Sequence, residues 1–214
     1  MKTMPMKKFF GLLGAILIGL PLVLILIDAA HPKTCLGAAP PVGTLIEIPG
    51  ERMEIMPSPN PNELHLSVTR DPFEIEGYQL QPAHGHIHPY QTETFAVTAG
   101  RAQVLADTEL LTPEAGETAV VPPNTLHHWM ALDEQPVTVD AVFYPSAEVA
   151  EWFVHFQRHI NDDTMDLFQA AVIAREFPHG SPAPVEPPAW VWAVVSRVLA
   201  PVARLIGYKP CPSA

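Results

Sequence analysis

Positive charge is scarce in this 214-residue sequence, which has 12 lysines and arginines against 23 aspartates and glutamates and a formal net charge of −11. A protein that binds nucleic acid needs a positive surface, so nucleic acid is not an expected partner. The excess of acidic residues mainly favours solubility of the polar part of the chain.

Cysteine is also scarce, with only Cys35 and Cys211 present, near opposite ends of the chain. A disulfide between them would join the two ends of the protein in an oxidising compartment. Two unpaired thiols are equally compatible with the sequence, so the cysteine content leaves Cys35–Cys211 pairing open.

Proline, by contrast, is abundant: 25 prolines interrupt the chain repeatedly, which disfavours a helical bundle. Between residues 44 and 144, short apolar runs alternate with turns rich in proline, glycine and asparagine. This pattern predicts a mainly β domain, an antiparallel β-barrel or jelly roll. The clearest runs are 64–68, 73–76, 118–121 and 137–142.

Beyond residue 144 the apolar spacing becomes helical, and residues 145–177 are predicted to form helices that cover the barrel. A proline-rich linker at 178–188 then leads to an amphipathic helix at 189–206. We expect this last helix to lie at a membrane interface. Spanning the membrane would bury Arg197 and Arg204 at a cost of roughly 2.5–3.5 kcal/mol each, and packing on the protein itself is the alternative.

One long apolar run does occur, at residues 9–27, after a lysine-bearing segment at 1–8. At 1.5 Å per residue the run spans about 28 Å, close to the roughly 30 Å of a bilayer core, and the lysines favour a cytoplasmic N-terminus. The run therefore predicts a single-pass transmembrane helix or signal anchor, followed by a linker at 28–43. The alternative is a cleaved signal peptide and a secreted or periplasmic protein. Either way the β domain lies outside the cytoplasm.

The residues that indicate chemistry are His86, His88, Glu93, Gly100 and His127. In a β-strand alternate side chains point to the same face, so His86 and His88 can bind one ion together. Glu93 follows a short polar bend and can reach the same ion. Gly100 is expected to close a hairpin, because such turns often need a residue that tolerates a positive φ.

These residues resemble the cupin family, in particular its small single-domain members. The first cupin motif is H-x-H, four residues, Glu, six residues and Gly, and it is matched in full. The second motif is matched in part, by Gly116, Pro122 and His127, with Asn124 in place of a glycine and Ala131 in place of an asparagine. The resemblance covers roughly residues 64–144.

The resemblance implies that His86, His88, Glu93 and His127 are metal ligands inside a small β-barrel. Three imidazoles and one carboxylate suit iron, manganese, nickel, copper or zinc and leave coordination positions open. His84 is a candidate base beside the ligands. His128 is expected to point away from the ion. His155 and His159 lie one helical turn apart without a third donor, and we expect them on a solvated helix face.

We therefore expect a membrane-anchored protein that binds one divalent metal and a small-molecule ligand. The protein is a possible homodimer. A dioxygenase or an isomerase acting on a small oxygenated molecule is the enzymatic hypothesis. The alternative is a noncatalytic, membrane-tethered ligand-binding or sensor module, because cupin-like proteins include both enzymes and binding domains.

Overall fold

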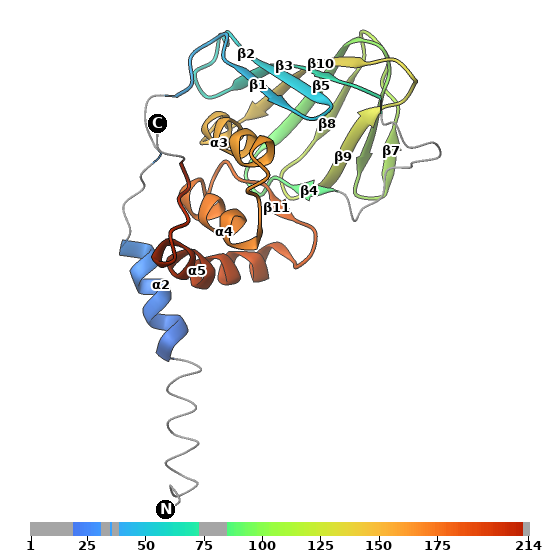
Figure 1. The fold of residues 1–214 in the computed structure, drawn as a ribbon. Helices are drawn as coiled ribbons and strands as arrows, with labels where there is room; N and C mark the ends of the chain where they lie inside the picture. Colours follow the sequence, from blue (N-terminus) through green and yellow to red (C-terminus); the bar gives the residue numbers. More distant parts are fainter. Residues whose placement is uncertain (1–18, 31–34, 36–38, 73–84, 212–214) are drawn as a thin grey trace, which may run out of the picture.

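Two antiparallel β-sheets form the body of the protein in a computed structural model that describes residues 19–30, 35, 39–72 and 85–211 (Figure 1). The larger sheet has six strands in the order β1-β2-β3-β10-β5-β8, and the smaller has five in the order β11-β4-β9-β6-β7. The larger sheet consists of β1 (Leu45–Ile48), β2 (Glu51–Met56), β3 (Leu64–Arg70), β10 (Val137–Tyr144), β5 (Thr92–Ala99) and β8 (Thr118–Val121). The smaller sheet consists of β11 (Ala183–Pro184), β4 (His86–Ile87), β9 (Leu126–Ala131), β6 (Ala102–Ala106) and β7 (Glu109–Leu111).

The main apolar core is built from the alternating inward side chains of these strands. In β5, for example, Glu93, Phe95 and Val97 are buried while the residues between them are more exposed. Phe143 of β10 and Val121 of β8 lie opposite Glu93 in the strand register. The same alternation that buries apolar residues therefore directs the Glu93 carboxylate inward.

The prediction of mainly antiparallel sheet with C-terminal helices is confirmed, but the prediction of a closed barrel is wrong. Among the described residues, no strand pairs with both sheets, so each sheet keeps two edges. The connection from β8 to β9 contains Pro122, Pro123 and Asn124, whose φ is +61°. Because proline has no N–H to donate to a ladder, the pairing ends there and the chain passes from the larger sheet to the smaller one.

Gly100 also serves a different connection from the one expected. Its φ of +77° confirms the need for glycine, and a Cβ at this position would lie 2.8 Å from the carbonyl oxygen of Pro136. The flanking strands β5 and β6 belong to different sheets, however, so they do not form a hairpin. Gly100 instead allows the chain to turn between the sheets.

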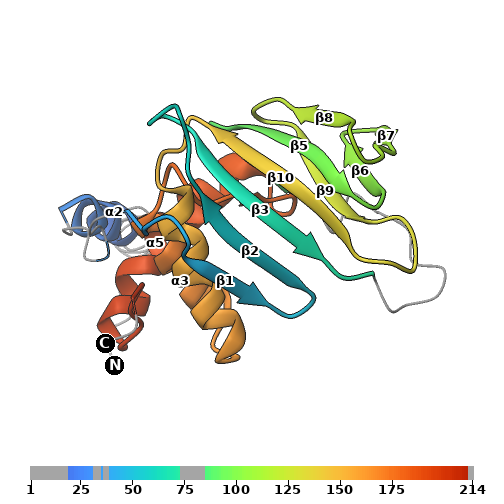
Figure 2. The ribbon, with the colours of Figure 1, turned by 90° about the horizontal axis from the view of Figure 1, so that it is seen from above.

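Helices gather at one end of the sheets (Figures 1 and 2). They are α2 (Leu20–Ala30), α3 (Val149–Asn161), α4 (Leu167–Glu176) and α5 (Ala189–Leu205). Helix α3 packs against β1, while α5 packs against both α4 and α2. Asp166 caps α4 by accepting a hydrogen bond of 2.8 Å from the backbone N–H of Gln169, which satisfies one free donor of the first turn.

Helix α5 occupies most of the segment expected at a membrane interface. One side packs on the protein through Ser196, Ala200 and Ala203, whereas Trp190 is 73% exposed and Leu205 is 80% exposed. Among the residues that the structure describes, no helix is both long enough and apolar enough to cross a membrane. The predicted membrane run at 9–27 lies largely outside the described residues, and its last part forms the start of α2.

The two segments predicted as linkers carry structure of their own. Helix α2 continues into the first one, to Ala30, and Asp28 is buried there in ion pairs with Arg175 (2.6 Å) and Arg204 (2.9 Å). A disulfide joins Cys35 to Cys211, with a Cα–Cα distance of 5.8 Å. In the second segment, β11 pairs with β4 and extends the smaller sheet beside His86.

Candidate metal centre

Strands β4 and β9 place two of the candidate ligands directly opposite each other. His86 pairs with His127 in the antiparallel register, so both side chains project from the same face of the smaller sheet. His88 follows β4 by one residue and alternates back to that face, while Ile87 points the other way. The H-x-H spacing and the strand register together bring three imidazoles into one place.

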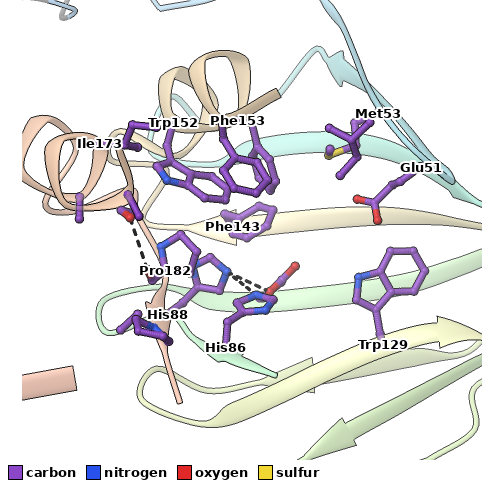
Figure 3. A pocket seen from close by; sticks show the side chains of 18 of the residues that line it. Glu51, Met53, His86, His88, Trp129, Phe143, Trp152, Phe153, Ile173 and Pro182 are labelled. Atoms are coloured by element: carbon purple, nitrogen blue, oxygen red, sulfur yellow. Dashed lines mark hydrogen bonds and ion pairs between the residues drawn. The ribbon is translucent and has the colours of Figure 1, made fainter. Parts of the chain in front are cut away.

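The carboxylate comes from the opposite sheet. Glu93 of β5 points inward from the larger sheet, and its Oε2 lies 2.8 Å from His127 Nε2 and 3.6 Å from His88 Nε2. His86 Nε2 lies 3.2 Å from His88 Nε2. The site therefore bridges the two sheets, and Figure 3 shows His86 and His88 reaching into the space between them.

These distances fit a single ion. One donor atom from each of the four residues lies within 4.8 Å of all the others. Donors about 2.0–2.2 Å from one metal lie at most about 4.4 Å apart, so the separations of 2.8, 3.2 and 3.6 Å are within the range for a shared ion. Glu93 and His127 are buried, which removes competing water from most of the site.

The backbone holds His127 in one tautomer. Its Nδ1 lies 3.0 Å from the carbonyl oxygen of Thr125, so Nδ1–H donates to that oxygen and Nε2 faces the centre. A hydrogen bond of this kind from the outer nitrogen is the usual way in which a ligand imidazole is oriented. The local turn therefore prepares His127 to donate an electron pair.

Burial acts to lower the pKa of all three histidines, and the Glu93 carboxylate opposes it at His88 and His127. Burial lowers the pKa of His86 well below its ordinary value, with the neighbouring histidines adding to the effect. Burial lowers the pKa of His88 to about 4, although the Glu93 carboxylate opposes the shift. Burial also acts to lower the pKa of His127, but the hydrogen bond and charge of Glu93 outweigh it and raise that pKa. His86 and His88 are thus neutral at pH 7, the form that binds metals.

The structure brings together all four residues proposed as ligands, His86, His88, Glu93 and His127. His84, the candidate base, lies outside the described residues. His128 alternates with the buried His127 along β9 and is only partly buried.

The expectation that His155 and His159 lie on a solvated helix face is wrong. His159 is buried, its Nδ1 is 2.9 Å from Thr164 Oγ1, and its Nε2 is 3.2 Å from Gln169 Nε2. His155 stacks on Phe177 at 5.4 Å between ring centroids. The helical spacing was recognised, but α4 and the C-terminal segment cover this face of α3, which no local pattern reveals.

A cavity of about 520 Å³ adjoins three of the four candidate ligands. His86, His88 and Glu93 line it near the middle, with Trp129 and Glu51 on one side and Trp152 and Phe153 on the other (Figure 3). The sequence did not single out Glu51 or its ion-pair partner Arg70, because neither belongs to a motif and charged residues are common in strands. Trp152 and Phe153 fall within residues 145–177, which were predicted only to form covering helices.

Residues 78–143 match the family model described as Cupin domain. This match supports the cupin superfamily for the segment that carries the four candidate ligands. A comparison with curated proteins found no match.

Similar solved structures include KdgF from a Halomonas species, at 22% identity and a TM-score of 0.40, covering 48% of this chain and 86% of that one. An RmlC-like cupin from Shewanella frigidimarina has 18% identity and a TM-score of 0.39, covering 50% and 86%. The nucleoside dehydratase Pac13 from Streptomyces has 15% identity and a TM-score of 0.38, covering 48% and 75%.

Proposed function

We propose that this protein is a cupin-type metalloenzyme that binds one divalent transition metal through His86, His88, Glu93 and His127. The observation that carries the proposal is the convergence of three imidazoles and one carboxylate, from both sheets, within 4.8 Å of one another. The proposed activity is that of a dioxygenase or isomerase acting on an oxygen-bearing molecule held in the adjoining cavity.

A metal with open positions would polarise a substrate oxygen or activate a bound small molecule. The protein's own residues orient the candidate ligands and exclude water from the site. Thr125 fixes the His127 ring, and the Phe143 ring lies 5.4 Å from that of His88, so it shields this side of the site from water. Glu93 supplies negative charge from the larger sheet, which favours a cation between the three imidazole rings.

Elemental analysis of the full-length protein, purified in detergent without chelator, tests the site. We expect close to one equivalent of metal in the parent protein and in His128→Ala, but only traces in the double variant His86→Ala/His88→Ala. His128→Ala is the matched control because it removes an imidazole next to His127 without removing a candidate ligand. Circular dichroism shows whether each variant is folded.

Trace metal in the parent after reloading with iron, manganese, nickel, copper or zinc would contradict the proposal. Equal metal in the parent and the double variant would also contradict it. Loss of metal in His128→Ala would contradict the assignment, because it would make His128 a ligand in place of His127.

A noncatalytic binding module is the second candidate, and one observation favours it. Among the described residues that line the cavity, the acids and bases besides the candidate ligands are Glu51, Arg70 and Glu186. Glu51 is ion-paired with Arg70, and Glu186 is exposed. Neither of these two carboxylates is therefore well placed to carry a proton. Metal-dependent product formation would favour the enzyme, whereas ligand binding without product in the metal-loaded protein would favour the module.

We also propose that the protein is anchored to a membrane and that its sheets lie outside the cytoplasm. The apolar run at 9–27 with its preceding lysines supports this, and so do the exposed apolar residues of α2, including Leu22, Val23 and Leu26. Cleavage near residue 30 would remove Asp28 and leave Arg175 and Arg204 without this partner. We therefore expect an uncleaved chain, resistant to alkaline carbonate extraction. A mature mass that lacks about the first 30 residues would contradict retention.

A further inference from the structure

Aromatic rings form a continuous wall from the candidate metal centre to the helices. The His88 ring lies 5.4 Å from that of Phe143, and Phe143 lies 5.9 Å from Phe153. Trp152 contacts Phe153 at 4.9 Å and stacks on Phe156 at 4.6 Å. Figure 3 shows Phe143, Phe153 and Trp152 along one side of the cavity. This wall offers ring faces and edges to a ligand rather than hydrogen bonds.

The facing side of this part of the cavity is apolar as well. We call the part lined by α3, α4 and residues 181–187 the helical arm. Helix α4 contributes Ala170, Ile173 and Ala174, and the segment after it contributes Pro182 and Ala183. Among the described lining residues of the helical arm, Glu186 alone is charged, and this residue is exposed to solvent.

Charged groups lie at the opposite end of the cavity, where they already bind one another. Arg70 Nε donates to Glu51 Oε2 at 2.6 Å, and Arg70 Nη1 donates to the carbonyl oxygen of Trp129. The guanidinium also lies 4.3 Å from the Trp129 ring centroid. These groups line that end of the cavity and are paired with one another, so they do not form a free anion site.

We infer that the site takes an amphipathic molecule, with an oxygen-bearing head at the four candidate ligands and an apolar chain or ring system in the helical arm. The inference rests on the proposed metal site and names its substrate class. A sugar or other polyhydroxylated ligand would leave its hydroxyls unpaired against the aromatic wall, which is unfavourable. The cavity of about 520 Å³ can enclose such a molecule, since pockets for compounds of that kind measure roughly 300–1,000 Å³.

A homologous series of carboxylates tests the apolar arm. Butanoate, hexanoate, octanoate and decanoate are titrated by calorimetry into the full-length protein, loaded with zinc as a redox-inert probe and kept in an amphipol. We expect affinity to rise roughly fourfold per added methylene until the helical arm is full. Gluconate, with hydroxyls along its chain, should bind more weakly than hexanoate.

Ala170→Phe fills the helical arm, and Ala115→Phe adds the same ring at an exposed turn. We expect Ala170→Phe to weaken decanoate binding by about tenfold or more, with unchanged zinc content, and Ala115→Phe to behave like the parent. Because all three proteins share the amphipol, partition of the ligand into it cancels in the comparison. The zinc content confirms that the site is intact in each variant.

The outcomes separate the two proposals. If zinc is bound but the carboxylate affinity does not depend on chain length, or is equal in the two phenylalanine variants, the substrate class is overturned and the metal site stands. Chain-length dependence in a protein that binds no zinc would retain the apolar arm and refute the metal site. Tighter binding of gluconate than of hexanoate would also overturn the inference.

Discussion

Asn124 connects the backbone of the turn to the candidate ligands. Its backbone N–H donates to the carbonyl oxygen of His88 at 2.9 Å, and its φ of +61° lies in the left-handed region. The turn thereby fixes the end of β4 and sets the start of β9, where His127 follows. Asparagine tolerates this conformation better than other residues with a Cβ, and glycine tolerates it fully.

Replacing Asn124 with valine should therefore destabilise the protein by about 1–2 kcal/mol, because a β-branched residue is strained at this φ. Asn124→Gly should leave the free energy of unfolding nearly unchanged. Chemical denaturation monitored by tryptophan fluorescence measures both variants. Equal stability of the valine and glycine variants would show that the left-handed turn is not maintained in solution.

Helix α2 packs on α5 and carries one buried carboxylate, Asp28, into the contact. Asp28 accepts hydrogen bonds from Arg175 of α4 and Arg204 of α5, and all three side chains are at least largely buried. Glu176 Oε2 lies a further 3.7 Å from Arg204. The contact between α2 and α5 thus includes a largely buried ion-pair network centred on Asp28.

Asp28→Asn should weaken this attachment by about 3 kcal/mol, because removing one partner leaves buried arginines uncompensated. Hydrogen–deuterium exchange along residues 20–30 reports the free energy of opening α2. Asp162→Asn is the matched control, since Asp162 is exposed at the end of α3. Unchanged exchange in Asp28→Asn would mean that α2 does not dock as described.

On the scale of the whole molecule, the Cys35–Cys211 disulfide closes a loop with a sequence separation of 176. Cys35 follows α2, and Cys211 follows α5, so the bond joins the segments that leave these two helices. The backbone N–H of Cys35 donates to Glu176 Oε1 at 2.7 Å, which fixes the bridge against α4. A cross-link over so long a loop removes much of the unfolded chain's conformational freedom.

The double variant Cys35→Ser/Cys211→Ser should lose about 2–5 kcal/mol of stability. Reduction of the parent with dithiothreitol should lower its stability to that of the variant, and the same reductant should leave the variant unchanged. Denaturant midpoints measured with and without reductant provide the test. A parent insensitive to reductant would indicate that the thiols are not paired.

Much of the candidate site was predictable because its spacing is local. His86 and His88 share a face by strand alternation alone, and the resemblance to the cupin motifs added Glu93 and His127. The left-handed backbone at Gly100 was likewise readable, because glycine marks positions of positive φ. The mistakes lie where distant segments meet. The sheets do not close into a barrel, since β5 and β6 pair in different sheets. His155 and His159 are covered by segments that follow them in the chain.

The sequence by itself determined the mainly antiparallel character, the C-terminal helices and the H-x-H pair, since each depends on periodicity within about ten residues. Tertiary structure alone decided which strands share a sheet, and it paired Cys35 with Cys211 and Asp28 with two arginines. It also joined the aromatic rings of α3 to Phe143 beside the candidate ligands. These contacts depend on packing between residues from ten to more than a hundred positions apart, and no local pattern records which surfaces bury one another.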